Sequence, residues 1–382
     1  MRKIHSIIAT LSAALLLGGA GPAAAQFYTQ HNLVSDIPGL ADHTDSFLVN
    51  AWGLTASASS PWWVANNGTA TSTLYNGNTG AKVALTNLPC QCVNVPGAPT
   101  GIVFNGTPFS TGTGFVVASG GASGPARFIF ASEDGSISGW NSAVPPPVPP
   151  PPLVSSQAII AVPASEDAVY KGLAIASTIP GNVAGDFLYA TNFRAGTVDV
   201  FDHTFAKLSP GRFADPRIPE GYAPFGIQNI GGIIYVTYAL QDEDKKDDVP
   251  GMGHGFVNAF DTSGILIRRV ASRGTLNSPW GLALSPADFG TFSNDLLVGN
   301  FGDGRIHAYD PTDILDNGQY EHLGMLHSAS GPPLEIEGLW ALRFGNGGGA
   351  GPMNTLFFTA GPDDESHGLF GSIVHAGHPG KK

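Results

Sequence analysis

Three asparagines occupy matching places in similar segments of the chain. Asn66, Asn192 and Asn300 end the short apolar stretches WWVAN, LYATN and LLVGN, and Glu337 stands just before LWALRF. Amide and carboxylate oxygens are the ligands that Ca²⁺ prefers. These four residues are therefore candidate calcium ligands, unless each asparagine only caps its own turn. Further carboxylates occur nearby in the sequence, at Asp242, Asp244, Asp303, Asp363, Asp364 and Glu365.

A second set of residues stands directly before a Gly-Leu, Gly-Ile or Ala-Leu pair. Four members are aromatic, and the set is Trp52, Lys171, Phe225, Trp280 and Trp340, with Thr100 in the sixth place. An arc of aromatic rings opposite a lysine suits a planar or sugar-like ligand, which makes the five residues candidate ligand contacts. The alternative is that the rings are core residues, as large aromatics usually are.

Catalytic signatures are scarce. The chain has no His-Glu-x-x-His, Gly-x-Ser-x-Gly or Walker sequence. His367, in DDESHG, is the one histidine beside acids that we expect on the same face as these residues, and it is either a general base or a surface residue. The sequence leaves open whether the protein is an enzyme.

The elements that must position these residues form a repeat. LLVGNFGDGRIHAYD (296–310) alternates as two strands around a glycine turn, and LYATNFRAGTVDVFD (188–202) nearly copies it. Looser copies occur at 61–76, at 234–238 with 255–261, at 114–121 with 126–132, and at 355–373. A short strand precedes each copy, with glycine or alanine at positions 53, 101, 172, 226, 281 and 341. Six such units predict an all-β, six-bladed β-propeller.

This architecture brings both sets of residues to one face. The innermost strand of a blade starts at the face conventionally called the top, and the loop after the second strand returns to it. Residues 27–35 read as a lone strand, which we expect to close the last blade, formed by roughly 339–375.

Several segments fall outside the repeat. Residues 1–25 have a basic start, an apolar core and an Ala-Ala-Ala end, which predict a signal peptide and an exported protein, with a single domain over 26–382. The proline-rich insertion 144–154 predicts a stiff surface spacer, and the acidic insertion 240–255 a solvated loop. Cys90 and Cys92 are a local disulfide or free thiols.

Charge narrows the choice of partners. Without Arg2 and Lys3 the chain has 18 − 2 = 16 basic and 30 acidic residues, a formal charge of −14. This argues against nucleic acid and anionic membranes, and it suits cationic ligands or metal ions. No segment after residue 25 is long and apolar enough to span a membrane.

Long phrases carry a family resemblance. NLVSDIPGLA, APTGIVFNG, FIFASEDGSISGWN, NSPWGLALSPADFG and FFTAGPDDESHGLFGSI resemble uncharacterised secreted bacterial proteins, some with a PEP-CTERM sorting tail that is not seen here. The chain is more loosely similar to NHL and gluconolactonase-type propellers. That likeness implies calcium at the channel mouth, with Asn66, Asn192, Asn300 and Glu337 as counterparts of the ligands. No unit has a clear glutamate in the first innermost strand, where such lactonases place one.

Two functions follow. The first is an exported binding or scaffold propeller that recognises a small molecule, a glycan, a peptide or an envelope component at the top face. The second is a calcium-dependent hydrolase or lactonase at the same face, in which the ion would polarise a carbonyl and activate water.

Overall fold

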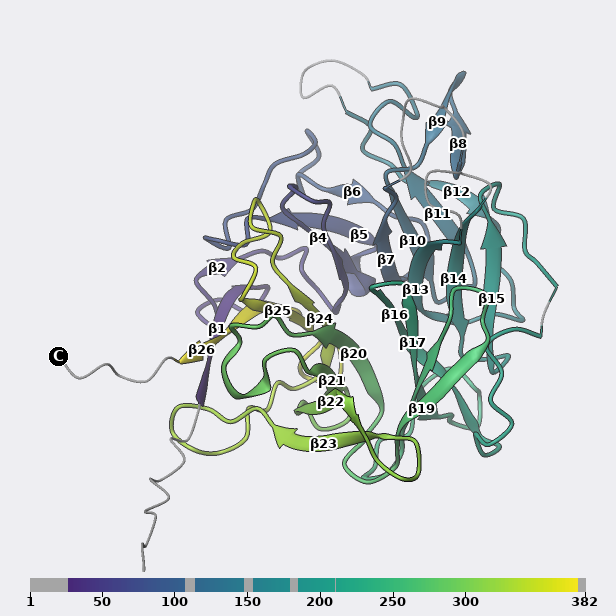
Figure 1. Cartoon of the computed structure of the whole chain (residues 1–382). Coiled ribbons are helices and arrows are strands. Elements are labelled where there is room, and N and C mark those ends of the chain that lie inside the picture. Colours follow the sequence, from purple (N-terminus) through teal and green to yellow (C-terminus); the bar gives the residue numbers. More distant parts are fainter. Residues whose placement is uncertain (1–26, 107–113, 148–153, 179–184, 210, 377–382) are drawn as a thin grey trace, which may run out of the picture.

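Six small antiparallel sheets are arranged around a common centre (Figure 1). The structure is a computed structural model that describes residues 27–106, 114–147, 154–178, 185–209 and 211–376. The predicted six-bladed β-propeller is confirmed, while the predicted signal peptide lies outside the described residues. The strands β7, β13, β16, β20 and β24 lie nearest the centre in Figure 1.

The blades follow one another along the chain, and each starts with its innermost strand. Blade 1 comprises β3 (Ala51–Thr55), β4 (Trp62–Asn66), β5 (Thr71–Tyr75) and β6 (Val93–Asn94). Blade 2 comprises β7 (Pro99–Phe104), β10 (Phe128–Ser132), β11 (Ile137–Trp140) and β12 (Ile159–Val162). Blade 3 comprises β13 (Tyr170–Ser177), β14 (Asp186–Asn192) and β15 (Thr197–Asp202).

The second half of the chain repeats the pattern. Blade 4 comprises β16 (Tyr222–Ile230), β17 (Ile233–Leu240), β18 (Phe256–Phe260) and β19 (Leu266–Ser272). Blade 5 comprises β20 (Pro279–Leu284), β21 (Leu296–Asn300), β22 (Ile306–Ile314) and β23 (Tyr320–Met325). Blade 6 contains β24 (Leu339–Phe344), β25 (Leu356–Ala360) and β26 (Leu369–Ala376).

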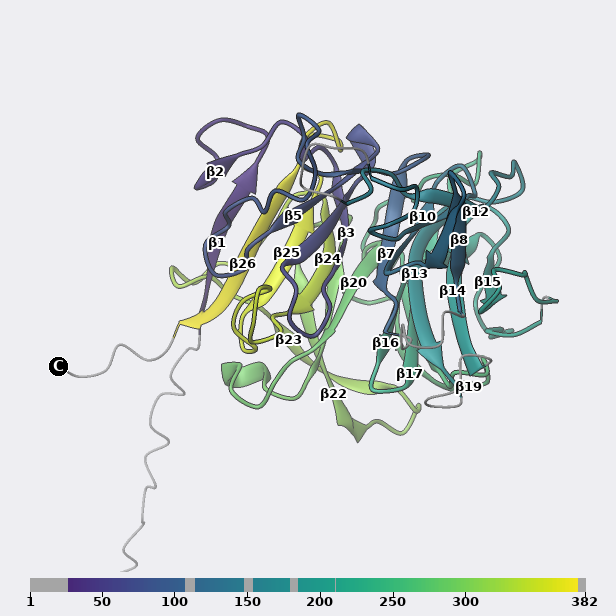
Figure 2. The same cartoon turned by 90° about the horizontal axis from the view of Figure 1, so that it is seen from above.

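The N-terminal strand closes the ring, as predicted. β1 (Phe27–Ser35) pairs antiparallel with β26 from Phe27 opposite Ala376 to Ser35 opposite Leu369. The short β2 (His43–Thr44) then adds to β1 in parallel. Figure 2 shows β1, β26 and β25 side by side. Joining the two ends of the chain in one sheet covers an edge that would otherwise be open.

Blade 2 corrects one strand assignment. The segment 114–121 was expected to pair within the blade, but β8 (Val116–Ser119) and β9 (Ala122–Pro125) form a separate hairpin. The true second strand is β10, and it ends at Ser132. The proline-rich insertion 144–154 lies only partly within the described residues.

Glycine lets the innermost strands approach closely. A Cβ on Gly226 would lie 2.1 Å from the Trp280 carbonyl oxygen in the next blade, and one on Gly53 would lie 2.3 Å from the Thr100 oxygen. The pairing register also shifts near the start of these strands, as between Pro224 and Ile227. Glycine and a bulge at this point tighten the ring and aim the preceding side chain at the channel.

Apolar residues on both faces of each sheet fill the space between blades. Leu296–Asn300 is buried throughout, and Leu282 and Val298 of blade 5 pack with Val257 of blade 4. Sheets covered on both sides by neighbours lose the polar and apolar alternation of a surface sheet. Cys90 and Cys92 form a disulfide across 5.1 Å between Cα atoms, with Gln91 at φ 51° providing the turn.

Candidate binding site at the top of the channel

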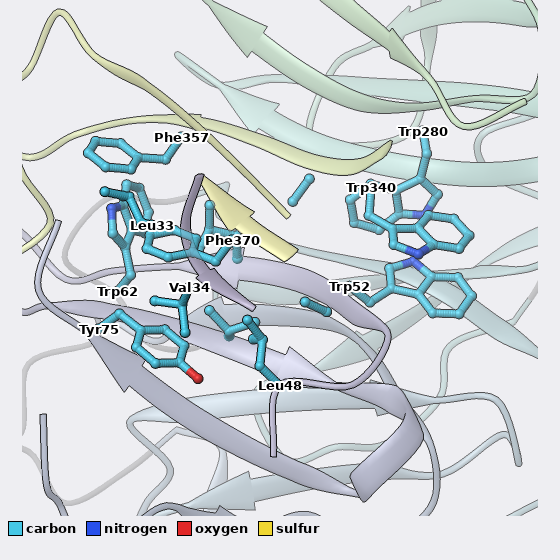
Figure 3. Packing of buried hydrophobic residues seen from close by; sticks show 14 of the residues in the cluster. Leu33, Val34, Leu48, Trp52, Trp62, Tyr75, Trp280, Trp340, Phe357 and Phe370 are labelled. Carbon is cyan, nitrogen blue, oxygen red and sulfur yellow. The ribbon is translucent and has the colours of Figure 1, made fainter. Parts of the chain in front are cut away.

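Aromatic rings close the centre of the propeller. The Trp52 and Trp340 rings stack with centroids 3.7 Å apart, and Trp280 and Phe225 each lie 5.8 Å from Trp340. Phe301 stacks on Trp340 at 4.0 Å. Figure 3 shows the three indoles packed against one another. The structure thus brings the predicted aromatic residues together. Because Trp52, Trp340 and Phe225 are at most 1% exposed, they pack as core and offer no open stacking surface.

Lys171 lies beside this aromatic core with its charge paired. Its side chain is 2% exposed, and its Nζ lies 2.5 Å from Glu133 Oε1 and 2.9 Å from Asp247 Oδ1. The ammonium also lies 5.0 Å from the centre of the Trp52 ring, within cation–π range. Burial alone would lower the pKa of Lys171, but the two carboxylates outweigh it and raise the pKa. The lysine is therefore charged, and it ties blades 2, 3 and 4 together.

A second chain of hydrogen bonds extends the network to blades 1 and 6. Trp340 Nε1 donates to Asn50 Oδ1 at 3.0 Å, and Asn50 Nδ2 donates to Glu365 Oε2 at 2.5 Å. Asn67 Nδ2 donates to Glu133 Oε2 at 3.1 Å. The polar residues from five blades thus converge on one group above the aromatic rings.

The carboxylates of this group differ in their protonation. Burial raises the pKa of Glu365 to about 7, despite the opposing effects of Lys171 and of the Asn50 hydrogen bond. Burial also raises the pKa of Asp248 to about 6. Lys171 keeps the pKa of Asp247 below its usual value, against the opposing effect of burial. Near neutral pH the site therefore holds the Lys171 ammonium, the ionised Asp247 carboxylate beside it, and, in Glu365, a carboxyl that readily gains or loses a proton.

The predicted calcium ligands are not part of the hydrogen-bonded group around Lys171. Asn192 Oδ1 accepts from the backbone N–H of Val169 and Ala195, and Asn300 Oδ1 accepts from Asn277 N–H. These contacts match the turn-capping alternative. Asn66 Nδ2 donates to the hydroxyls of two threonines on β5, while Asn66 Oδ1 is buried without a partner.

The fourth predicted ligand, Glu337, is exposed and accepts from Asp363 N–H at 3.1 Å. The oxygens of Asn192, Asn300 and Glu337 thus have other partners, and these residues do not fit a shared ion. Within the described ranges, no group of three His, Cys, Asp or Glu side chains could hold a metal.

His367 lies at the edge of this face. Its Nδ1 is 2.7 Å from Asp36 Oδ2, and its Nε2 is 3.9 Å from Asp363. The Asp36 hydrogen bond raises the pKa of His367. This pairing holds the imidazole against β1, so His367 is tied to the closing strand of the ring.

Sequence reasoning missed most of the polar group around Lys171. Asn50, Asn67, Glu133 and Asp247 were not among its candidates. Asn67 and Glu133 each directly follow the second strand of a blade, and that position was the available signal. Asp247 lies in the 240–255 insertion, whose acidic residues were expected to be solvated.

Two viral proteins are clear relatives. The uncharacterised protein R648 of Acanthamoeba polyphaga mimivirus is 35% identical over 351 residues, which covers 89% of this chain and 78% of R648. The uncharacterised protein L690 of the same virus is 33% identical over 90% of this chain and 84% of its own length. The chain belongs to the family of these proteins. No protein-family model matches it.

Solved structures agree on the fold. Virginiamycin B lyase from Staphylococcus aureus aligns with a TM-score of 0.50 at 12% identity, over 91% of this chain and 99% of the lyase. A protein of unknown function from Bacteroides thetaiotaomicron aligns at 0.52 and 11% identity, over 91% and 76% of the two chains. At this identity the likeness concerns the fold alone. The resemblance to secreted bacterial proteins stays a prediction.

Proposed function

We propose that this protein is an exported binding propeller that captures a small ligand with a cationic group at the top mouth of its channel. The observation that carries the proposal is the group around Lys171, in which acidic side chains outnumber the single buried ammonium. Glu133 and Asp247 contact Lys171, and Glu365 lies in the same network. We call Glu133, Asp247 and Glu365 the acidic rim of the channel. A cation bound there would lie in a partly desolvated region with more negative than positive side chains.

The carboxylates of this site are also more accessible to a ligand than the ammonium is. The Lys171 ammonium is buried, whereas the side chains of Glu133 and Asp247 are 15% and 55% exposed. A ligand from solvent would therefore reach carboxylate oxygens first. The packed indoles below supply a rigid floor, so little side-chain entropy would be lost on binding.

An amine and its neutral counterpart provide the sharpest test. We expect glucosamine and spermidine to bind in isothermal titration calorimetry, and N-acetylglucosamine, which lacks the charge, to bind at least tenfold more weakly. Glu365→Gln keeps the size and the acceptor for Asn50, and it should weaken glucosamine binding. Asp288→Asn, on an exposed residue bonded to Asn354, is the matched control.

Two results would count against this function. Equal affinity for glucosamine and N-acetylglucosamine would remove the role of charge. Calcium-dependent turnover of a lactone, lost in Glu365→Gln and kept in Asp288→Asn, would replace binding with the hydrolase alternative.

A further inference from the structure

The opposite, bottom end of the channel contains a cavity of about 160 Å³. Its walls come from the second halves of innermost strands in blades 1, 2, 3, 4 and 6 and from Ala56, which follows the strand of blade 1. Five of its eight lining residues are apolar, and Thr55, Asn229 and Arg343 give the wall a polar side. The lining residues are Thr55, Ala56, Val103, Phe104, Ala174, Ile175, Asn229 and Arg343.

Arg343 is the cation of this cavity. It extends from β24 in blade 6 to Gln228 on β16 in blade 4, where Nη2 donates to Gln228 Oε1 at 3.3 Å. Burial lowers the pKa of Arg343 to about 10, and no charged neighbour opposes this effect. In the described part of the chain no carboxylate lies within 4 Å of the guanidinium, and the remaining residues include no Asp or Glu.

A partly buried guanidinium without a carboxylate is costly to maintain. It has five N–H donors, of which one makes a long bond to the neutral Gln228 amide. None of its nitrogens is buried without a partner, so the other donors are open to a ligand that enters from solvent. A partner of opposite charge is the usual compensation for a desolvated ion. The neighbouring Asn229 offers none, since its Nδ2 donates to the Ile175 oxygen and its Oδ1 accepts from Gly232 N–H.

We propose that Arg343 and the apolar walls of this cavity form a binding site for a small organic carboxylate. The carboxylate would accept two parallel hydrogen bonds from the guanidinium, a pairing that is geometrically specific. Its hydrocarbon part would lie against Val103, Phe104 and Ile175. This site is at the far end of the channel from Lys171 and is independent of the function proposed above.

Benzoate titration of the full chain tests the site. At constant ionic strength, sodium benzoate should raise the thermal unfolding midpoint in a saturable way, and inorganic phosphate, which has no apolar part, should act more weakly. Arg343→Met should weaken benzoate binding at least tenfold in calorimetry. It should also unfold at a higher temperature than the wild type without ligand, because an uncompensated charge is gone.

Matched variants keep the outcome interpretable. Arg212→Met removes an exposed arginine that donates to the Ser263 oxygen, and it should bind benzoate normally. Arg343→Lys keeps the charge but loses the paired donors, and it should bind at intermediate strength if Arg343→Met does not fold. Benzoate binding that is absent in the wild type, or equal in Arg343→Met, overturns the proposal. Loss of amine binding in Glu365→Gln with benzoate binding intact separates the two sites.

Discussion

The two ends of the channel differ in how a cation is compensated: Lys171 at the top is buried, whereas Arg343 at the bottom is partly buried. At the top, Lys171 has two carboxylates within 3 Å and a third acid in the same network. At the bottom, Arg343 has one amide oxygen at 3.3 Å. Both cations are on innermost strands, so the fold that positions them is the same. The difference is which blade loops reach them.

The two ends differ in the acidic side chains that surround the cation. The loops after the second strands bring Glu133, Asp247 and Glu365 to the top, where acidic side chains outnumber the buried ammonium. The ends of the innermost strands at the bottom bring no acid to Arg343. A channel with unequal compensation at its two mouths favours a cationic ligand at one end and an anionic ligand at the other.

Removing the cation at the top, Lys171, is expected to lower the free energy of unfolding more than any other change considered. Lys171→Met leaves Glu133 and Asp247 facing each other without a counter-ion, and we expect the free energy of unfolding to fall by about 3 kcal/mol. Urea unfolding at pH 7 measures it. Lys246→Met removes a half-exposed lysine 3.8 Å from the same Asp247 and should cost less than about 0.5 kcal/mol. A loss for Lys171→Met as small as the control's would show that the pairing contributes little.

The second-largest loss of stability is expected when the packed tryptophans below Lys171 are displaced without a change of charge. In Gly226→Ala the new methyl group meets the Trp280 carbonyl oxygen, and Trp280 Nε1 donates to the Lys171 oxygen at 3.0 Å. We expect a loss of about 2 kcal/mol from overpacking, together with a changed tryptophan emission spectrum. Gly106→Ala has only one neighbouring atom, at 3.9 Å, and should leave both readouts unchanged. Equal stability of the two variants would contradict the close approach of blades 4 and 5.

The top end should also make stability depend on pH. Glu365 binds its proton more tightly in the folded chain than in the unfolded one, because burial raises its pKa from 4.5 to about 7. The folded state therefore holds more protons between these values, and the free energy of unfolding falls as pH rises from 4.5 to 7. Asp248 contributes with the same sign.

Glu365→Gln cannot titrate and should flatten this slope, with a gain over wild type of about 1 kcal/mol at pH 8. Urea unfolding at pH 5 and pH 8 measures it. Asp288→Asn should keep the wild-type slope. A Glu365→Gln slope identical to that of the wild type would mean that Glu365 is ionised throughout this range.

The repeated pattern made the fold predictable from the sequence. Each Gly-Leu or Gly-Ile pair is local, recurs in register, and has one physical cause, the close approach of neighbouring innermost strands. The aromatic residues before it were correctly expected to share one face. Whether they contact a ligand or one another depends on packing across blades, which no single repeat encodes.

The acidic rim was harder to predict for three reasons. The hairpin β8–β9 resembles the start of a blade, so the segment 114–121 was taken as the second strand in place of β10, and Glu133, which follows β10, was overlooked. Asp247 lies in an insertion that has no counterpart in other blades. In blade 1 the predicted Asn66 ends β4, whereas the next residue, Asn67, makes the hydrogen bond to Glu133. Successive side chains of a strand point to opposite sides, so a shift of one residue changes what a side chain reaches.

The smallest predicted change in stability comes from asparagines at the end of a second strand, such as Asn192, and directly after one, such as Asn67. Asn192→Ala removes two backbone N–H contacts in blade 3 and should lower the free energy of unfolding by about 1 kcal/mol without affecting ligand binding. Asn67→Ala removes the hydrogen bond to Glu133 at the rim and should cost less stability, about 0.5 kcal/mol, while weakening glucosamine binding. Urea unfolding and calorimetry on both variants separate the two roles. If Asn192→Ala weakens glucosamine binding more than Asn67→Ala does, the ligand contacts the ends of the second strands rather than Asn67 and Glu133.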